Sequence, residues 1–271
     1  MDRQEAETIL SSAGSLTDGE FPLLEAAIAC AIHEEPARDA AAAREVAAIG
    51  VERLTQRLKR ESPEEAIAET MAGDLGLSGD LFTPDDPDNA DVVALANRRR
   101  GLAVTIGVYY LHAARRCGLT VQGVDFPGHF LLRIETEEGP LALDPFSEGR
   151  VVLPSELTRR ALHAGLTPNV ADRLDRLMAP VSDRAVLLRL QNVVFAQASK
   201  LGDFGRAERA ALRRALLDPT DHRPWLDVAS AREGQGALAG ALEALQRATA
   251  LDGGAALAAR AQRERVRLKL N

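Results

Sequence analysis

The chain has 271 residues, of which 46% are hydrophobic and 27% charged, and its formal net charge is −7. This length supplies one large domain or two ordinary ones with a buried core, and the composition excludes a wholly disordered chain. The acidic balance excludes general nucleic-acid binding, because no basic excess is present to displace counterions from phosphates.

Cysteine usage and the N-terminus indicate the compartment. Cys30 and Cys117 lie far apart within apolar helical patterns and form neither a CxxC pair nor a disulfide framework. A reducing compartment fits this usage best. The N-terminus lacks the basic start and apolar run of a signal peptide, and no window approaches the ~20 apolar residues that span a bilayer. We therefore expect a cytoplasmic protein with no membrane partner.

The N-terminal region is predicted to be helical. Thr17 and Glu20 form a capping-box pattern, and apolar residues follow them at helical spacing until Pro36. A second helix with an alanine-rich apolar stripe is expected from about Asp39 to Lys59. The segment Leu75–Asp91 is rich in Gly, Pro and Asp, which is typical of a surface loop.

The centre of the chain combines one buried helix with short strands. Gly101–Arg116 is apolar on most sides and predicts a buried helix. Alternation then predicts three strands, and Thr136–Gly139 is the turn between the second and third. The predicted strands are Thr120–Asp125, His129–Glu135 and Pro140–Leu143.

The C-terminal region returns to helix and contains a repeat with a period of 34 residues. Four positions recur at this spacing: Gly202 and Gly236, Ala207 and Ala241, Leu217 and Leu251, Asp218 and Asp252. This period, with small residues where paired helices touch, is typical of tetratricopeptide repeats. We therefore predict two domains, one over residues 1–180 and a helical repeat over 181–271.

The candidate catalytic residues are a histidine that opens one strand and an aspartate that closes the next. If the turn is centred on Glu137 and Glu138, Asp144 lies opposite Leu131, on the same sheet face as His129. Diagonal neighbours are about 7–8 Å apart at the backbone, within reach of an Asp–His hydrogen bond. Such a pair orients an imidazole for Cys–His–Asp chemistry. The alternative is a partly buried histidine beside an ordinary Asp-Pro turn.

The order of these elements resembles the transglutaminase-like superfamily. More narrowly, the chain resembles the SirB-type family of bacterial proteins, in which such a domain precedes tetratricopeptide-like helices. The resemblance runs from about Asp86 to Asp252, and it implies that His129 and Asp144 occupy the histidine and aspartate positions of the superfamily triad. The matching pieces are Asp86-Pro87-Asp88-Asn89, Arg99-Arg100-Gly101, Gly123 to Arg133, Asp144-Pro145-Phe146 and the repeat from Leu188. The fold implied is a mostly helical α+β, papain-like domain with a small antiparallel sheet, followed by the repeat.

The expected nucleophile is missing from this pattern. Active members of the superfamily carry a cysteine at the start of the buried helix, where the helix dipole lowers the thiol pKa. This sequence has Leu102-Ala103-Val104-Thr105-Ile106 there. Thr105 supplies a hydroxyl, which is a poor nucleophile without an aligned base and an oxyanion hole. Cys117 lies near the C-terminal end of the same helix, so it is an unfavourable substitute.

Two classes of function follow from these features. The first is a non-catalytic module that binds a protein or peptide partner through the C-terminal repeat. The second is an amide-bond hydrolase or acyltransferase that uses His129 and Asp144 with an unrecognised nucleophile. A third possibility is that the two residues only stabilise the hairpin. A small metal site formed by His129, Asp125 and Asp144 is disfavoured, and no metal or other cofactor is expected.

Overall fold

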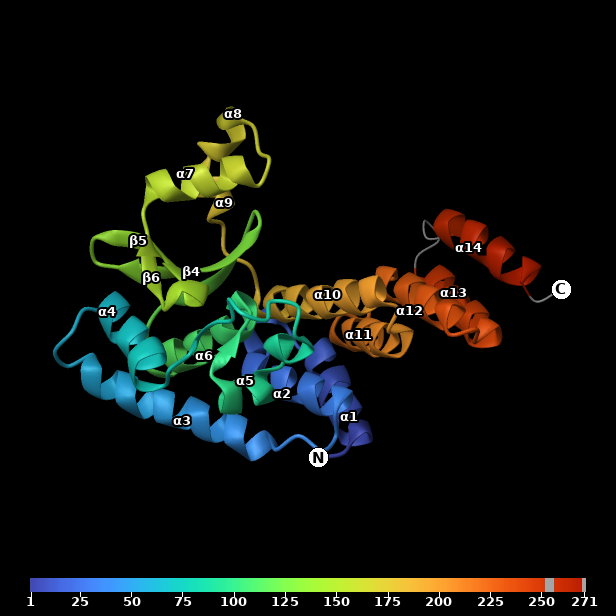
Figure 1. Ribbon diagram of the computed structural model, residues 1–271, viewed down its shortest axis with the longest axis horizontal. Coiled ribbons are helices and arrows are strands. Elements are labelled where there is room, and N and C mark those ends of the chain that lie inside the picture. The colour runs from blue at the N-terminus through green and yellow to red at the C-terminus, as the bar shows by residue number, and fades with distance from the viewer. Residues whose placement is uncertain (252–255, 270–271) are drawn as a thin grey trace. The chain divides into compact units, whose positions relative to one another are not determined.

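The computed structural model describes residues 1–251 and 256–269, and the chain divides into two compact units (Figure 1). The first unit comprises Met1–Phe21, Ile32–Pro36 and Leu188–Asn271, and the second comprises Pro22–Ala31 and Ala37–Leu187. The N-terminal helix α1 (Arg3–Ser15) therefore belongs to the same unit as the C-terminal helices, whereas its position in the sequence assigned it to the predicted domain over residues 1–180.

The second unit is built around a four-stranded antiparallel sheet with the order β3-β4-β5-β6. Its strands are β3 (Val121–Phe126), β4 (His129–Thr136), β5 (Gly139–Asp144) and β6 (Arg150–Val152). The three predicted strands are found within one residue of their expected ends, while β6 was not predicted. A second, two-stranded parallel sheet pairs β1 (Ser78–Gly79) with β2 (Arg100–Gly101).

Helices make up most of the rest of this unit. Those of the second unit, with two that extend into the first, are α2 (Leu23–Glu34), α3 (Ala40–Arg57), α4 (Pro63–Ala68), α5 (Val92–Arg98), α6 (Ala103–Arg116), α7 (Pro154–His163), α8 (Pro168–Ala171), α9 (Leu174–Leu177) and α10 (Asp183–Leu201). Short η segments, in 3-10 or π conformation, are η1 (Asp18–Glu20), η2 (Glu69–Asp74), η3 (Pro87–Ala90) and η4 (Pro145–Ser147). Within this unit α6 lies on one side of the sheet and α7 on the other (Figure 1).

The two faces of the sheet bury different sets of side chains. Phe130 faces α6 so closely that a Cβ built on Gly107 would lie 2.4 Å from its ring, which explains a glycine in this helix. On the other face, Val124, Phe126 and Leu131 join a core cluster with Leu157 and other residues of α7–α9. Side chains alternate along β4, so its even-numbered residues face α6 and its odd-numbered residues face α7–α9.

The first unit consists of helices. Besides α1 and most of α10, they are α11 (Phe204–Leu217), α12 (Arg223–Gly234), α13 (Leu238–Leu251) and α14 (Ala256–Leu268). The starts of α11 and α13 are 238 − 204 = 34 residues apart. Gly202 and Gly236 precede them with positive φ angles of 73° and 76°, and Ala207 and Ala241 are both fully buried. Asp252, the last of the recurring positions, lies outside the described residues.

A buried arginine organises the polar interior of the first unit. Arg213 donates from Nε to Gln191 Oε1 at 2.6 Å and from Nη1 to Glu34 Oε2 at 2.7 Å. The same Nη1 lies 3.4 Å from His33 Nδ1, and His33 Nε2 lies 3.2 Å from Glu7 Oε1. This geometry fits a neutral imidazole that accepts at Nδ1 and donates at Nε2. Burial, and then the charge of Arg213, lower the pKa of His33 to about 4.

The architecture confirms the predicted class, a mostly helical α+β fold with a small antiparallel sheet. Across residues 1–251 and 256–269, every helix is too short or too polar to cross a lipid bilayer.

The neutral state of His33 makes the stability of the protein pH-dependent. Because the pKa is depressed on folding, the unfolded chain binds more protons, so stability is full above about pH 6.5 and falls as pH decreases toward about 4. Between pH 7 and pH 4.5 we expect the wild type to lose about 2 kcal/mol more unfolding free energy than His33→Gln. Urea unfolding at both values measures this, with His163→Gln on the exposed end of α7 as control. Equal losses in all three proteins contradict the prediction.

Candidate functional site

The sheet register brings His129 and Asp144 to the same face. Leu132 pairs with Leu143 and Arg133 with Ala142, so one further step sets Asp144 opposite Leu131, as the turn predicted. His129 pairs with Phe126, and their ring centroids are 6.5 Å apart. Both candidates therefore lie on the face covered by α7–α9, opposite to the face packed on α6.

Asp144 is buried, with only 4% of its surface exposed, and among the described residues its carboxylate bonds to groups other than His129. Its Oδ1 accepts hydrogen bonds from the backbone N–H of Phe146 at 3.0 Å and of Ser147 at 3.3 Å. Its Oδ2 accepts from Ser147 Oγ at 3.1 Å and from Arg160 Nη1 at 2.8 Å. The carboxylate thus caps the short helix η4 and forms a buried ion pair with α7.

Arg160 is the residue that sequence reasoning missed. It extends from α7, where it also donates from Nη2 to Glu156 Oε1 at 2.8 Å, and Arg150 donates to both Glu156 oxygens at 2.9 and 2.7 Å. The Arg150 and Arg160 guanidinium groups lower the pKa of Glu156 to about 2. Signals for α7 were present, since Pro154 and Glu156 suit a first helical turn, but nothing local links Arg160 to Asp144.

His129 is exposed, and its side chain makes no hydrogen bond within the portion of the chain that the structure describes. Partial burial of the ring lowers its pKa, and the positive charge of Arg160 acts in the same direction. Asp144 and Glu156 raise the pKa by less than these two effects lower it.

Thr105 lies on the other side of the sheet, in the first turn of α6. It is fully buried, and its Oγ1 donates a hydrogen bond of 2.8 Å to the backbone oxygen of Asn89. The same oxygen accepts from the backbone N–H of Leu102 at 2.9 Å. The hydroxyl thus fastens the segment η3 to the start of α6, and the structure does not bring Thr105 together with His129.

The two cysteines form no disulfide, and neither accompanies His129. Cys30 is buried in α2, and Cys117 ends α6 with its Sγ 3.3 Å from Thr55 Oγ1. Among the described residues, no group of three His, Cys, Asp or Glu side chains is arranged to hold a metal ion.

The buried helix α6 and the antiparallel sheet that carries His129 and Asp144 lie within one stretch of the chain that matches a known family. The family model described as the transglutaminase-like superfamily matches residues 41–192. The chain therefore belongs to the transglutaminase-like superfamily.

The curated relatives are bacterial proteins that carry the name UPF0162. One from Xylella fastidiosa (strain Temecula1) is 30% identical over 238 residues, which cover 86% of this chain and 85% of the relative. One from Pseudomonas aeruginosa is 28% identical over 175 residues, covering 57% of this chain and 62% of the relative. A crystal structure of menin is similar with a TM-score of 0.41 and 10% identity over 92% of this chain and 70% of menin, which is too distant to indicate a shared fold.

The Asp144–Arg160 ion pair should matter for stability. Arg160→Gln leaves a buried carboxylate without its counter-charge, so we expect the unfolding free energy to fall by about 3 kcal/mol. Arg159→Gln is the matched control, because Arg159 is exposed on the same helix. Chemical denaturation near pH 7 measures both variants. A loss in Arg160→Gln no larger than in Arg159→Gln contradicts the role assigned to the pair.

Proposed function

We propose that this chain is a non-catalytic, nucleophile-lacking transglutaminase-like protein that acts as a protein-binding or regulatory module. The observation that carries the proposal is the engagement of Asp144 by Arg160, Ser147 and two backbone N–H groups. A carboxylate bound in this way has no role left in orienting His129. Catalysis by a triad needs nucleophile, base and orienting group in one hydrogen-bonded line.

The position of Thr105 supports the same proposal. A hydroxyl nucleophile must be in contact with a base and accessible to substrate. The Thr105 hydroxyl is buried and donates to Asn89, and the face of the sheet that carries His129 is turned away from α6.

The C-terminal helices are the proposed partner-binding surface. Helix pairs that recur at 34 residues stack into grooves that accept peptides or helices. On α14, Arg260 and Arg267 are exposed and form no ion pair with any described residue. Arg265 and Lys269 are instead held by Glu233 at 2.7 and 2.8 Å. This unneutralised basic face of an acidic protein favours a partner with an acidic segment.

One observation favours the enzymatic alternative, a hydrolase or acyltransferase acting on amide bonds. His129 and Asp144 lie on one face of neighbouring strands, with a depressed His129 pKa that leaves the imidazole neutral and able to accept a proton. This alternative needs a nucleophile that neither Thr105 nor the cysteines provide in the structure.

The non-catalytic proposal is tested with a panel of amide and ester substrates and with hydroxyl- and thiol-directed covalent probes. We expect no turnover by the wild type and no probe adduct at Thr105. His129→Ala should leave this result unchanged, because the exposed imidazole has no hydrogen-bonded partner among the described residues. The proposal fails if the wild type turns over a substrate and folded His129→Ala abolishes that turnover.

The partner surface is tested by charge reversal. The immobilised full chain is exposed to a bacterial lysate, and captured proteins are purified and titrated against wild type and the double variant Arg260→Glu/Arg267→Glu. We expect the variant to bind at least tenfold more weakly, with weaker binding of the wild type at high salt. The control is Arg116→Glu/Arg159→Glu, which reverses two exposed charges of the second unit. Equal affinity of both double variants excludes α14 as the docking face.

A further inference from the structure

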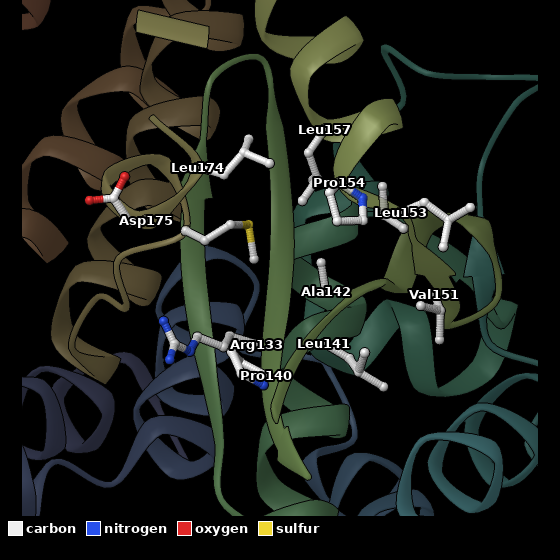
Figure 2. A pocket seen from close by; sticks show the side chains of 12 residues that line it. Arg133, Pro140, Leu141, Ala142, Val151, Leu153, Pro154, Leu157, Leu174 and Asp175 are labelled. Carbon is white, nitrogen blue, oxygen red and sulfur yellow. The ribbon is translucent and has the colours of Figure 1, made fainter. Parts of the chain in front are cut away.

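A pocket of about 260 Å³ lies on the sheet face that carries His129 and Asp144, and neither residue lines it (Figure 2). Its walls come from β4, β5 and β6 on one side and from α7, α9 and Met178 on the other. It is smaller than the 300–1,000 Å³ of sites for drug-sized ligands, so it suits a ligand of amino-acid size.

The interior of the pocket is apolar and largely preformed. Ala142, Leu157 and Met178 belong to the core cluster beneath the pocket, and each is at most 9% exposed. Leu174 packs against this cluster from α9. The neighbours of Ala142 are closely packed, and its small side chain leaves a space that a larger residue would fill. The hollow is this space.

Only two of the lining residues are charged, and they have opposite signs. Figure 2 shows the Arg133 guanidinium and the Asp175 carboxylate on the same side of the pocket, across from Leu141 and Val151. Arg133 donates from Nε to Glu135 Oε1 at 2.7 Å, and its two Nη atoms have no partner among the described residues. Asp175 is exposed and forms no hydrogen bond or ion pair with any described residue.

We propose that this pocket binds a zwitterion with an apolar side chain, namely an apolar α-amino acid or a short apolar peptide with free ends. The ligand carboxylate pairs with the Nη atoms of Arg133, which present a planar fork suited to a carboxylate. The ligand ammonium pairs with Asp175, and the apolar side chain fills the hollow over Ala142 and Leu157. The site lies in the second unit and is separate from the partner surface proposed on α14.

The combination of charges decides between this ligand and simpler ones. A fatty acid would use Arg133 but would place its negative head near Asp175, which is unfavourable. An apolar amine would use Asp175 but would leave the Nη atoms of Arg133 without an acceptor. Only a ligand that carries both charges next to an apolar group can pair with Arg133, pair with Asp175 and fill the apolar hollow.

The experiment is isothermal titration of the full chain with L-leucine and with the dipeptide Leu-Leu. Two analogues lack one charge each: 4-methylpentanoate has no ammonium group, and isopentylamine has no carboxylate. We expect at least one zwitterion to bind saturably and both analogues to bind roughly tenfold more weakly or worse, since a charged hydrogen bond is lost in each case. Whether leucine or the dipeptide binds more tightly distinguishes the two sources of the zwitterion.

Variants test which residue binds each charged group of the ligand. Asp175→Asn should weaken the zwitterion roughly tenfold and remove its advantage over 4-methylpentanoate, while Arg133→Gln should remove its advantage over isopentylamine. Asp172→Asn is the control, because Asp172 is exposed nearby but does not line the pocket. Ala142→Leu fills the hollow and should abolish binding, with circular dichroism to verify the fold.

Three results overturn the proposal. The first is no saturable binding of either zwitterion, and the second is equal binding of the singly charged analogues. The third is unchanged affinity in a folded Ala142→Leu variant. Each of these results leaves the non-catalytic proposal unaffected, because that proposal depends on substrate turnover and on Asp144.

Discussion

The ion pair between Asp144 and Arg160 is the constraint on which the second unit depends. A carboxylate that is 4% exposed needs both a counter-charge and hydrogen-bond donors, and Arg160 supplies the charge from α7. The pair therefore holds α7 against the sheet at the point where β5 ends. Glu156 reinforces this arrangement, since it binds Arg160 from within the same helix and Arg150 from β6. The same network occupies both carboxylate oxygens of Asp144 and includes no hydrogen bond to His129.

Transglutaminase-like architecture does not by itself define an activity, because function resides in the site and not in the fold. In this chain the sheet separates the features that a triad would unite. Thr105 belongs to the α6 face, where Phe130 closes against Gly107, whereas His129 belongs to the face under α7. Thr105 is hydrogen-bonded to Asn89 on one side of the sheet, and His129 lies on the other side, where the charge of Arg160 acts on it.

Local patterns predicted the strands well. Alternation along β4 and a two-residue turn were sufficient to place His129 and Asp144 on one face, because the side-chain period in a strand is two. Pairing with Arg160 was not predictable, since sixteen residues and a change of element separate it from Asp144. The first helix start was also predicted too early. Thr17 and Glu20 were expected to cap a long helix, but Thr17 donates to Glu20 ahead of the short segment η1, and α2 begins only at Leu23. The second helix, predicted from about Asp39 to Lys59, is found as α3.

Helix α7 contributes both to the pocket and to the buried ion pair. Leu157 lines the pocket and Arg160 holds Asp144, and residues three apart lie on the same side of a helix. Displacement of α7 to enlarge the pocket would stretch the buried ion pair, so the pocket is constrained to stay small. The buried ion pair that holds α7 in place therefore also fixes one wall of the pocket.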